Sequence, residues 1–162
     1  MQKIIPFLWY DKNAEEAMNF YVDTFNGSPG KSAESKITSI KRYEKGIKAP
    51  GMPEMEGKVL TGVFELNGQK FMALDGGPIF KFNESISLYV ECENQQEIDY
   101  FWDKLTADGG EPIECGWLKD KYGLRWQIHP KNMSELTRTT QQFNEMLKMK
   151  KIIIADLEKA VD

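Results

Sequence analysis

The chain has 162 residues, of which 41% are hydrophobic and 28% charged. This is an ordinary globular mixture for about one domain, and it excludes disordered, collagen-like and disulfide-scaffold classes for the bulk of the chain. The formal net charge of −4, from 21 basic and 25 acidic residues, argues against a dedicated nucleic-acid binder, which normally carries a basic excess.

The first predicted elements are a strand and an amphipathic helix. Residues 5–9 are apolar and rich in strand formers, and residues 13–16 (NAEE) have the pattern of an N-cap followed by Glu at the third helical position. Gly27 is a plausible stop for this helix. The residues spaced along one face of the helix are Ala14, Ala17, Met18, Tyr21 and Phe25.

The same pattern returns 81 residues later. Residues 86–90 predict a strand, residues 94–97 a second capping box, and Gly109-Gly110 a second stop. The second apolar stripe consists of Ile98, Phe101, Trp102 and Leu105. Because cap, box and stripe coincide without a gap, we infer an internal repeat.

Each copy continues into a predicted hairpin. Residues 59–66 and 69–74 flank Asn67-Gly68, and Asn-Gly between alternating apolar residues is the strongest short-range hairpin signal. Residues 113–118 and 124–128 flank a longer loop in the same way. Each copy is therefore predicted to be a strand, a helix and then a run of strands.

Three segments lie outside this pattern. Residues 37–43 predict a further strand, and residues 45–58, with three Gly and two Pro, predict a loop that is either functional or a mobile insertion. After Pro130 we expect two C-terminal helices, the second over residues 152–161. The first would carry Leu136, Phe143, Met146 and Leu147. Their apolar faces need a partner in the same domain or in another subunit.

Targeting signals and cysteine usage both predict a cytoplasmic protein. The longest apolar run, residues 4–10, is far shorter than the roughly 20 residues of a membrane span, and the N-terminus lacks a signal-peptide pattern. We therefore expect no membrane partner and no nucleic acid. Cys92 and Cys115 are expected to be free thiols. His129 is the single histidine, which excludes a multi-histidine metal site.

Residues 11–25 and the segment 115–130 (CGWLKDKYGLRWQIHP) resemble the vicinal oxygen chelate superfamily, also called the glyoxalase/bleomycin resistance/dioxygenase fold. In particular, they resemble its PhnB-like, 3-demethylubiquinone 3-methyltransferase-like branch. The resemblance implies an α+β domain over residues 1–130. Its two tandem βαβββ modules, 1–78 and 84–130, would place curved mixed sheets around a cleft, and residues 131–162 would form a helical extension. Members commonly dimerise, so we expect a homodimer.

The resemblance also locates the metal position of the superfamily. Metal-dependent members hold a divalent ion in the cleft with four ligands, typically His and Glu, which fall here on Pro6, Met72, Ser87 and Gln127. None of these offers a carboxylate, thiolate or imidazole, so we expect no metal. The turns before both helices lack the glycine of a usual S-adenosylmethionine site. Methyl transfer is thus implied by the resemblance alone, and we expect no cofactor.

Strand alternation suggests which side chains face the cleft. We expect the cleft-facing side to combine a more apolar wall from the first strand with polar groups from the later ones, as in most small-molecule sites. The predicted ligand-binding residues are Leu8, Tyr10, Met72, Ser87, Tyr89, Trp117, Arg125 and Gln127. Candidate catalytic residues are His129, Gln127 and Tyr89, and the alternative for His129 is an exposed surface or rim histidine. Cys115 is either a nucleophile or an inert buried thiol.

Three functions remain open on this basis. The first is a protein that binds a small hydrophobic or aromatic molecule in a metal-free cleft. The second is an enzyme (a lyase, isomerase, dioxygenase or methyltransferase) acting on an oxygen-rich substrate. The third is a dimeric structural or interaction module whose cleft is vestigial.

Overall fold

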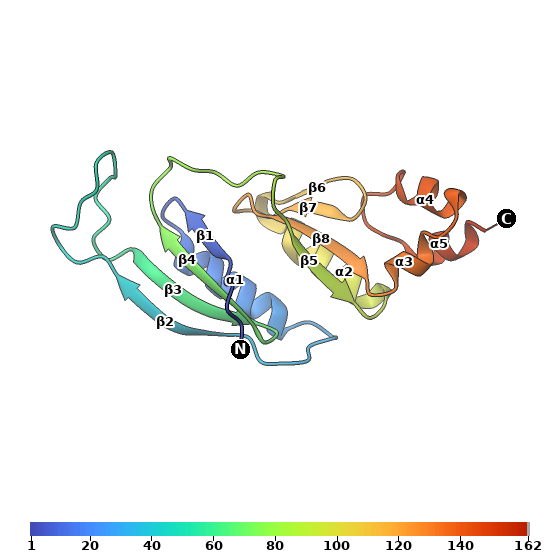
Figure 1. Ribbon diagram of the computed structural model, residues 1–162, viewed down its shortest axis with the longest axis horizontal. Coiled ribbons are helices and arrows are strands. Elements are labelled where there is room, and N and C mark those ends of the chain that lie inside the picture. The colour runs from blue at the N-terminus through green and yellow to red at the C-terminus, as the bar shows by residue number, and fades with distance from the viewer. Residues whose placement is uncertain (162) are drawn as a thin grey trace. The chain divides into compact units, whose positions relative to one another are not determined.

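The computed structural model describes residues 1–161 and divides the chain into two compact units (Figure 1). Unit 1 consists of Met1–Gly27 and Lys31–Lys81, and unit 2 consists of Ser28–Gly30 and Phe82–Asp162. Each unit has its own four-stranded sheet and its own long helix. None of the helices within residues 1–161 combines the length and the apolar character that crossing a membrane requires.

Unit 1 is a βαβββ module. Its sheet has the order β1-β4-β3-β2, in which β1 runs parallel to β4 and the other neighbours are antiparallel. Helix α1 packs on this sheet and buries its predicted apolar stripe, apart from the half-buried Phe25. The elements are β1 (Phe7–Tyr10), α1 (Ala14–Asn26), β2 (Lys36–Arg42), β3 (Val59–Leu66) and β4 (Gln69–Asp75).

Unit 2 repeats this topology. Its sheet has the order β5-β8-β7-β6, again with the first pair parallel and the others antiparallel. The elements are β5 (Leu88–Cys92), α2 (Gln95–Thr106), the 3₁₀ helix η1 (Ala107–Gly109), β6 (Glu111–Pro112), β7 (Trp117–Lys119) and β8 (Arg125–Pro130). The predicted α+β class and the tandem repeat of βαβββ modules are therefore confirmed.

The two helices begin differently, although their sequences predict the same cap. At α2 the Asn94 side chain accepts a hydrogen bond from the Glu97 N–H at 3.0 Å, as predicted. The Glu97 carboxylate closes the turn through the Glu93 N–H at 2.7 Å, one residue before the expected donor. At α1 Asn13 occupies the predicted N-cap position, but its side chain makes no capping hydrogen bond.

The first hairpin is confirmed and the second begins later than expected. Asn67 and Gly68 have φ values of 51° and 87°, the left-handed pair that a two-residue type I′ turn requires. In the second copy, Cys115 and Gly116 have φ values of 57° and 82° and form a turn of their own. Strand β7 therefore begins only at Trp117.

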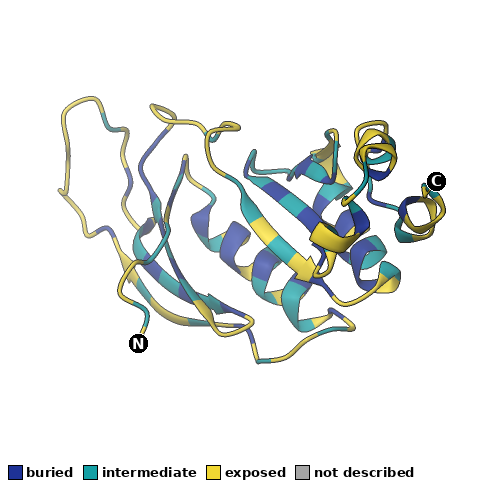
Figure 2. Ribbon diagram, turned by 45° about the vertical axis from the view of Figure 1, so that its right-hand side comes forward, coloured by how far each residue is buried: buried dark blue, intermediate teal, exposed yellow. Residues whose placement is uncertain are grey.

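The loop between β2 and β3 is exposed along most of its length (Figure 2). Two backbone hydrogen bonds close its base, from the Tyr43 N–H to the Lys58 carbonyl at 2.9 Å and from the Gly57 N–H to the Tyr43 carbonyl at 3.0 Å. Met55 folds inward and is buried. The predicted loop is confirmed, and it is anchored at both ends.

Within residues 131–161 the chain forms three short helices rather than two. They are α3 (Met133–Leu136), α4 (Thr140–Met146) and α5 (Ile154–Lys159). The first predicted helix is wrong because a capping box between Thr139 and Gln142 starts α4 anew. Part of the apolar surface is buried within unit 2, in a cluster of Leu136, Met149, Ile152 and Leu157. Phe143 and Leu147 remain exposed.

Candidate functional site

In unit 2, helix α2 packs against β5, β7 and β8 and covers one face of the sheet. The side chains on the covered face are Leu88, Val90, Cys92, Leu118, Trp126 and Ile128, all buried or half-buried. Alternation places the neighbouring residues on the opposite side, which we call the open face of unit 2. Its members are Ser87, Tyr89, Glu91, Trp117, Arg125, Gln127 and His129. Six of them are predicted site residues.

An aromatic–amide–aromatic row crosses the centre of this face. Tyr89 on β5 pairs in register with Gln127 on β8, which pairs in turn with Trp117 on β7. The Gln127 Nε2 donates a hydrogen bond to the Ser87 hydroxyl at 2.9 Å. The row thus combines two rings with one oriented amide–hydroxyl pair, so it offers both an apolar contact surface and directional hydrogen bonding.

His129 lies at the end of the open face and is buried, with 6% of its surface exposed. The Tyr89 ring lies against the imidazole, with centroids 4.9 Å apart and planes tilted by 30°. Burial lowers the pKa of His129, and the Cys115 backbone offsets this in part. The expected exposed rim position is therefore wrong, because Tyr89 covers the ring and the turn at Gly116 packs against it.

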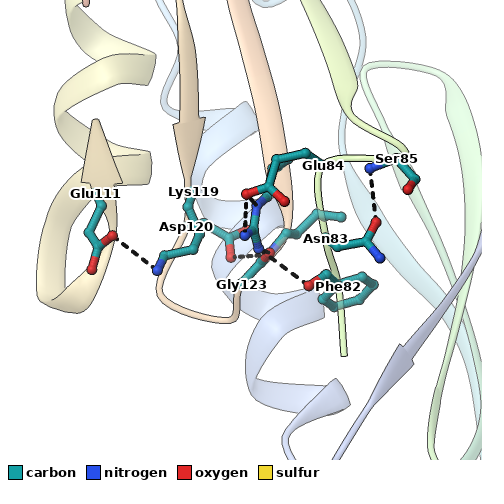
Figure 3. A network of polar contacts seen from close by, with 10 residues as sticks. Phe82, Asn83, Glu84, Ser85, Glu111, Lys119, Asp120 and Gly123 are labelled. Atoms are coloured by element: carbon teal, nitrogen blue, oxygen red, sulfur yellow. Dashed lines mark hydrogen bonds and ion pairs between the residues drawn. The ribbon is translucent and has the colours of Figure 1, made fainter. Parts of the chain in front are cut away.

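Arg125 is hydrogen-bonded to residues 82–84, which lie before β5 in unit 2. Its guanidinium donates hydrogen bonds to the Glu84 carboxylate at 2.7 and 3.2 Å, to the Phe82 carbonyl at 3.4 Å and to the Gly123 carbonyl at 2.5 Å (Figure 3). The hydrogen bond from Arg125 also lowers the pKa of Glu84. Through these hydrogen bonds Arg125 holds residues 82–84 against the start of β8.

In unit 1 the predicted face of the first strand is wrong. Leu8 and Tyr10 are 6% and 3% exposed, and the Tyr10 hydroxyl hydrogen-bonds the Tyr21 hydroxyl of α1 at 3.2 Å. Both therefore belong to the helix-covered side and are removed from the candidate site. Phe7 and Trp9 take their place on the open face of unit 1, where Phe7 pairs in register with Met72.

A one-residue difference between the copies explains this error. Tyr10, the last residue of β1, precedes the start of α1 by four positions, whereas Cys92, the last residue of β5, precedes the start of α2 by three. The first strands therefore correspond at an offset of 82 rather than 81, and a slip of one residue transfers every side chain to the other face. The length of this turn was the signal that could have revealed Phe7 and Trp9.

The same correction changes one of the four positions that correspond to the metal ligands of the superfamily. The residue of unit 1 that corresponds to Ser87 is Ile5, not Pro6, so the family positions become Ile5, Met72, Ser87 and Gln127. Isoleucine has no donor atom, the Met72 thioether is a soft ligand, and the other two are neutral oxygen or nitrogen donors. Within residues 1–161 there is no cluster of three or more His, Cys, Asp or Glu side chains. These residues do not fit a divalent cation.

Neither thiol is suited to act as a nucleophile. Burial raises the pKa of Cys92 to about 12, with further contributions from Glu97 and Glu93. Burial also raises the pKa of Cys115, and Glu114 acts in the same direction. Since the thiolate is the reactive form, both side chains remain neutral thiols at neutral pH.

Unit 1 also contains a polar hollow with a volume of about 330 Å³ beside the start of α1. Arg42 and Glu15 form a two-pronged ion pair in it, at 2.8 and 2.9 Å. This pair lowers the pKa of Glu15 and raises that of Arg42. The described lining residues include none of the predicted site residues.

Comparison with known proteins identifies the family to which this chain belongs. The family model described as 3-demethylubiquinone-9 3-methyltransferase matches residues 2–129. The chain belongs to this family. The PhnB protein of Bacillus cereus is 40% identical, with a TM-score of 0.65, over 79% of this chain and 99% of that one. The resemblance to the PhnB-like branch is thus confirmed.

A second solved structure supports the fold alone. A protein from Pseudomonas aeruginosa is 16% identical, with a TM-score of 0.61, over 80% of this chain and 98% of that one. A comparison with curated protein sequences found no match. The match to the family model ends at residue 129, so the helices α3, α4 and α5 lie beyond the matched residues.

Proposed function

We propose that this PhnB-like protein binds a small, flat, hydrophobic or aromatic molecule on the open face of unit 2, without a metal ion. The observation that carries the proposal is the row of Tyr89, Gln127 and Trp117 across the sheet. Tyr89 is 49% exposed, so an aromatic ring is presented where a ligand can reach it. We place this binding in the cytoplasm, where Cys92 and Cys115 stay reduced.

The chemistry of the row favours a ligand with one polar edge. Tyr89 and Trp117 supply flat apolar surface at a small cost in side-chain entropy. The Gln127 amide is oriented by its bond to Ser87, which leaves its carbonyl oxygen as an acceptor. A ligand that stacks on the rings and donates to this oxygen would satisfy both features.

The proposal is tested by a ligand-detected NMR screen of flat aromatic fragments. Fragments that bind the wild-type protein should lose about tenfold in affinity in Tyr89→Ala and in Gln127→Leu, the loss expected from about 1.4 kcal/mol. The matched control is Tyr100→Ala, which removes a half-buried tyrosine from helix α2. Fragments that bind all three variants equally, or the absence of any binder, would contradict the proposal.

A second copy of the chain is the protein partner that we propose. The large exposed apolar side chains of unit 1 include Phe7, Ile79 and Phe80, and exposed apolar surface is typical of an interaction surface where it forms a continuous patch. Sedimentation equilibrium should give twice the chain mass of 18.7 kDa. Phe7→Ser should weaken the dimer, and a wild-type protein that sediments at a single chain mass would contradict it.

An enzymatic role is the second candidate, and the buried neutral imidazole of His129 favours it. A neutral imidazole is the form that accepts a proton as a general base. Turnover of a bound fragment that disappears in His129→Phe, while binding persists, would support catalysis. If the same fragments bind and none is turned over, the enzymatic role is contradicted and only the binding role remains.

A further inference from the structure

His129 has an unusual environment for a polar side chain. Among the buried side-chain nitrogen and oxygen atoms of the described residues, its two ring nitrogens are the only ones without a hydrogen-bond partner. A buried polar group that lacks a partner destabilises the folded state. The Cys115 backbone lies near enough to raise the pKa of the imidazole, but neither ring nitrogen has a hydrogen bond of full geometry. At least one of the two nitrogens is therefore available to a ligand.

The walls around the imidazole come from three segments of unit 2. Gly116 lies so close that a Cβ atom added there would stand 2.6 Å from the His129 Nε2 and 3.0 Å from Ile152. Two backbone hydrogen bonds hold the turn against the C-terminal segment, from Cys115 to the Met149 carbonyl at 2.8 Å and from Gly116 to the Lys150 carbonyl at 2.7 Å. This side of the ring is therefore fixed.

Tyr89 covers a further side of the ring from the diagonal position on β5, where Glu91 is the cross-strand neighbour of His129. The Tyr89 ring is half exposed and contacts the imidazole face, and its hydroxyl makes no hydrogen bond to the described residues. A side-chain rotation of Tyr89 would break this ring contact but no hydrogen bond to the described residues, and an incoming aromatic ring would restore a ring contact with His129.

We infer that His129 is the polar anchor of a subsite beneath Tyr89, which takes a neutral aromatic molecule bearing an O–H or N–H donor. This inference rests on the proposed binding function and names the ligand chemistry for it. An incoming ring can replace the contact with Tyr89, and a buried, neutral imidazole receives a donor without burying a charge.

The direction of the hydrogen bond follows from the Cys115 backbone. Its influence on the imidazole raises the pKa, as a nearby carbonyl acceptor does. Gly116, the residue after Cys115, lies beside the His129 Nε2, and a carbonyl at this turn favours the ring N–H on the side that faces it. The other nitrogen then carries a lone pair, and its partner has to be a donor.

The single histidine of the chain makes a direct test possible. We would label the full-length protein with ¹⁵N-histidine and follow the two ring nitrogens while adding phenol, or anisole, which has the same ring without a donor. Phenol should shift one ring nitrogen by several ppm and bind at least fivefold more tightly than anisole. In His129→Phe, with its fold confirmed by circular dichroism, this preference should disappear.

The possible outcomes distinguish a failure of this inference from a failure of the proposed binding function. Equal binding of phenol and anisole, detected on Tyr89 and Trp117 but not on His129, would overturn this inference and leave the proposed function intact. Ring nitrogens that already show a strong hydrogen bond without ligand, and that do not respond to phenol, would also overturn it. The absence of any response from Tyr89, Trp117 or His129, to phenol, to anisole and to the fragments of the wider screen, would overturn both proposals.

Discussion

The carboxylate of Asp75, at the end of β4, caps helix α1 by accepting a hydrogen bond from the backbone N–H of Ala14 at 2.8 Å. Its other oxygen accepts from the Val59 N–H at 2.9 Å, and the side chain is buried. One residue thus joins the start of the helix to the start of β3. The cap expected from Asn13 is provided across the fold instead.

Asp75→Ala should lower the free energy of unfolding by about 3 kcal/mol, because two buried N–H groups lose their acceptor. Asp75→Asn keeps one acceptor oxygen and should recover part of the loss. Urea denaturation measures both values. The control is Asp11→Ala, an exposed carboxylate in the same region, which should change stability by less than about 0.5 kcal/mol. Equal effects of the Asp75 and Asp11 substitutions would contradict this role.

Asp120 organises the loop between β7 and β8 in a similar way. It is buried and accepts hydrogen bonds from the Tyr122 N–H at 2.8 Å, the Leu124 N–H at 3.1 Å and the Trp126 indole at 2.8 Å. Asp120→Ala should cost about 3 kcal/mol of stability, measured by urea denaturation.

Trp126→Phe provides the comparison for this loop, because it removes the indole donor and leaves the backbone contacts of Asp120. It should cost less than Asp120→Ala. A larger loss in Trp126→Phe would show that the indole packing, and not the carboxylate, stabilises the loop.

The sequence predicted best where a local signal agreed with the tertiary contacts. Asn67-Gly68 needed only its own backbone preference, and the stripe of α2 was fixed by its spacing. The helix cap at Asn94 is local as well. These elements were therefore correct in kind and close to correct in their bounds.

The errors arose where a distant contact or a single residue decided the outcome. The Asp75 cap lies 61 residues from its partner in sequence, so no local pattern contains it. The face of β1 depended on one residue in the turn before α1, which the regular repeat concealed. His129 is buried by Tyr89 and by the turn at Gly116, and neither contact can be read from its strand position.

The C-terminal extension is fastened by Gln95, the first residue of α2. The Gln95 amide donates to the Ile152 carbonyl at 2.9 Å and accepts from the Ile154 N–H at 2.8 Å, and Lys151 pairs with Asp99 at 2.9 Å nearby. The Gln95 side chain thus donates one hydrogen bond to the backbone of the extension and accepts another from it, as a neighbouring strand would do.

Gln95→Ala should loosen this attachment by about 1.4 kcal/mol, the cost of the lost hydrogen bonds. Amide hydrogen exchange in residues 152–157 should then be about tenfold faster, with the first half of the chain unchanged. Gln96→Ala is the matched control, because Gln96 is the exposed neighbour on the same helix. Equal exchange in the two variants would mean that the apolar cluster around Ile152 holds the extension without Gln95.

The burial of His129 predicts a specific dependence of stability on pH. Because the pKa of His129 is lowered in the folded protein from its ordinary value of 6.5, the unfolded chain binds a proton first as the pH falls. The contribution of His129 is therefore fully present above pH 6.5 and is lost as the pH falls from 6.5 toward the folded pKa. One proton limits the slope to about 1.4 kcal/mol per pH unit.

Urea denaturation between pH 8 and pH 5 of the wild type and of His129→Phe measures this contribution. The carboxylates, including Glu91 opposite His129 in the sheet, are present in both proteins, so the difference between the two curves isolates the imidazole. The wild type should lose stability relative to the variant below pH 6.5. A constant difference across this range would show that His129 is protonated as readily in the folded protein as in the unfolded chain, and its burial would then not govern its charge.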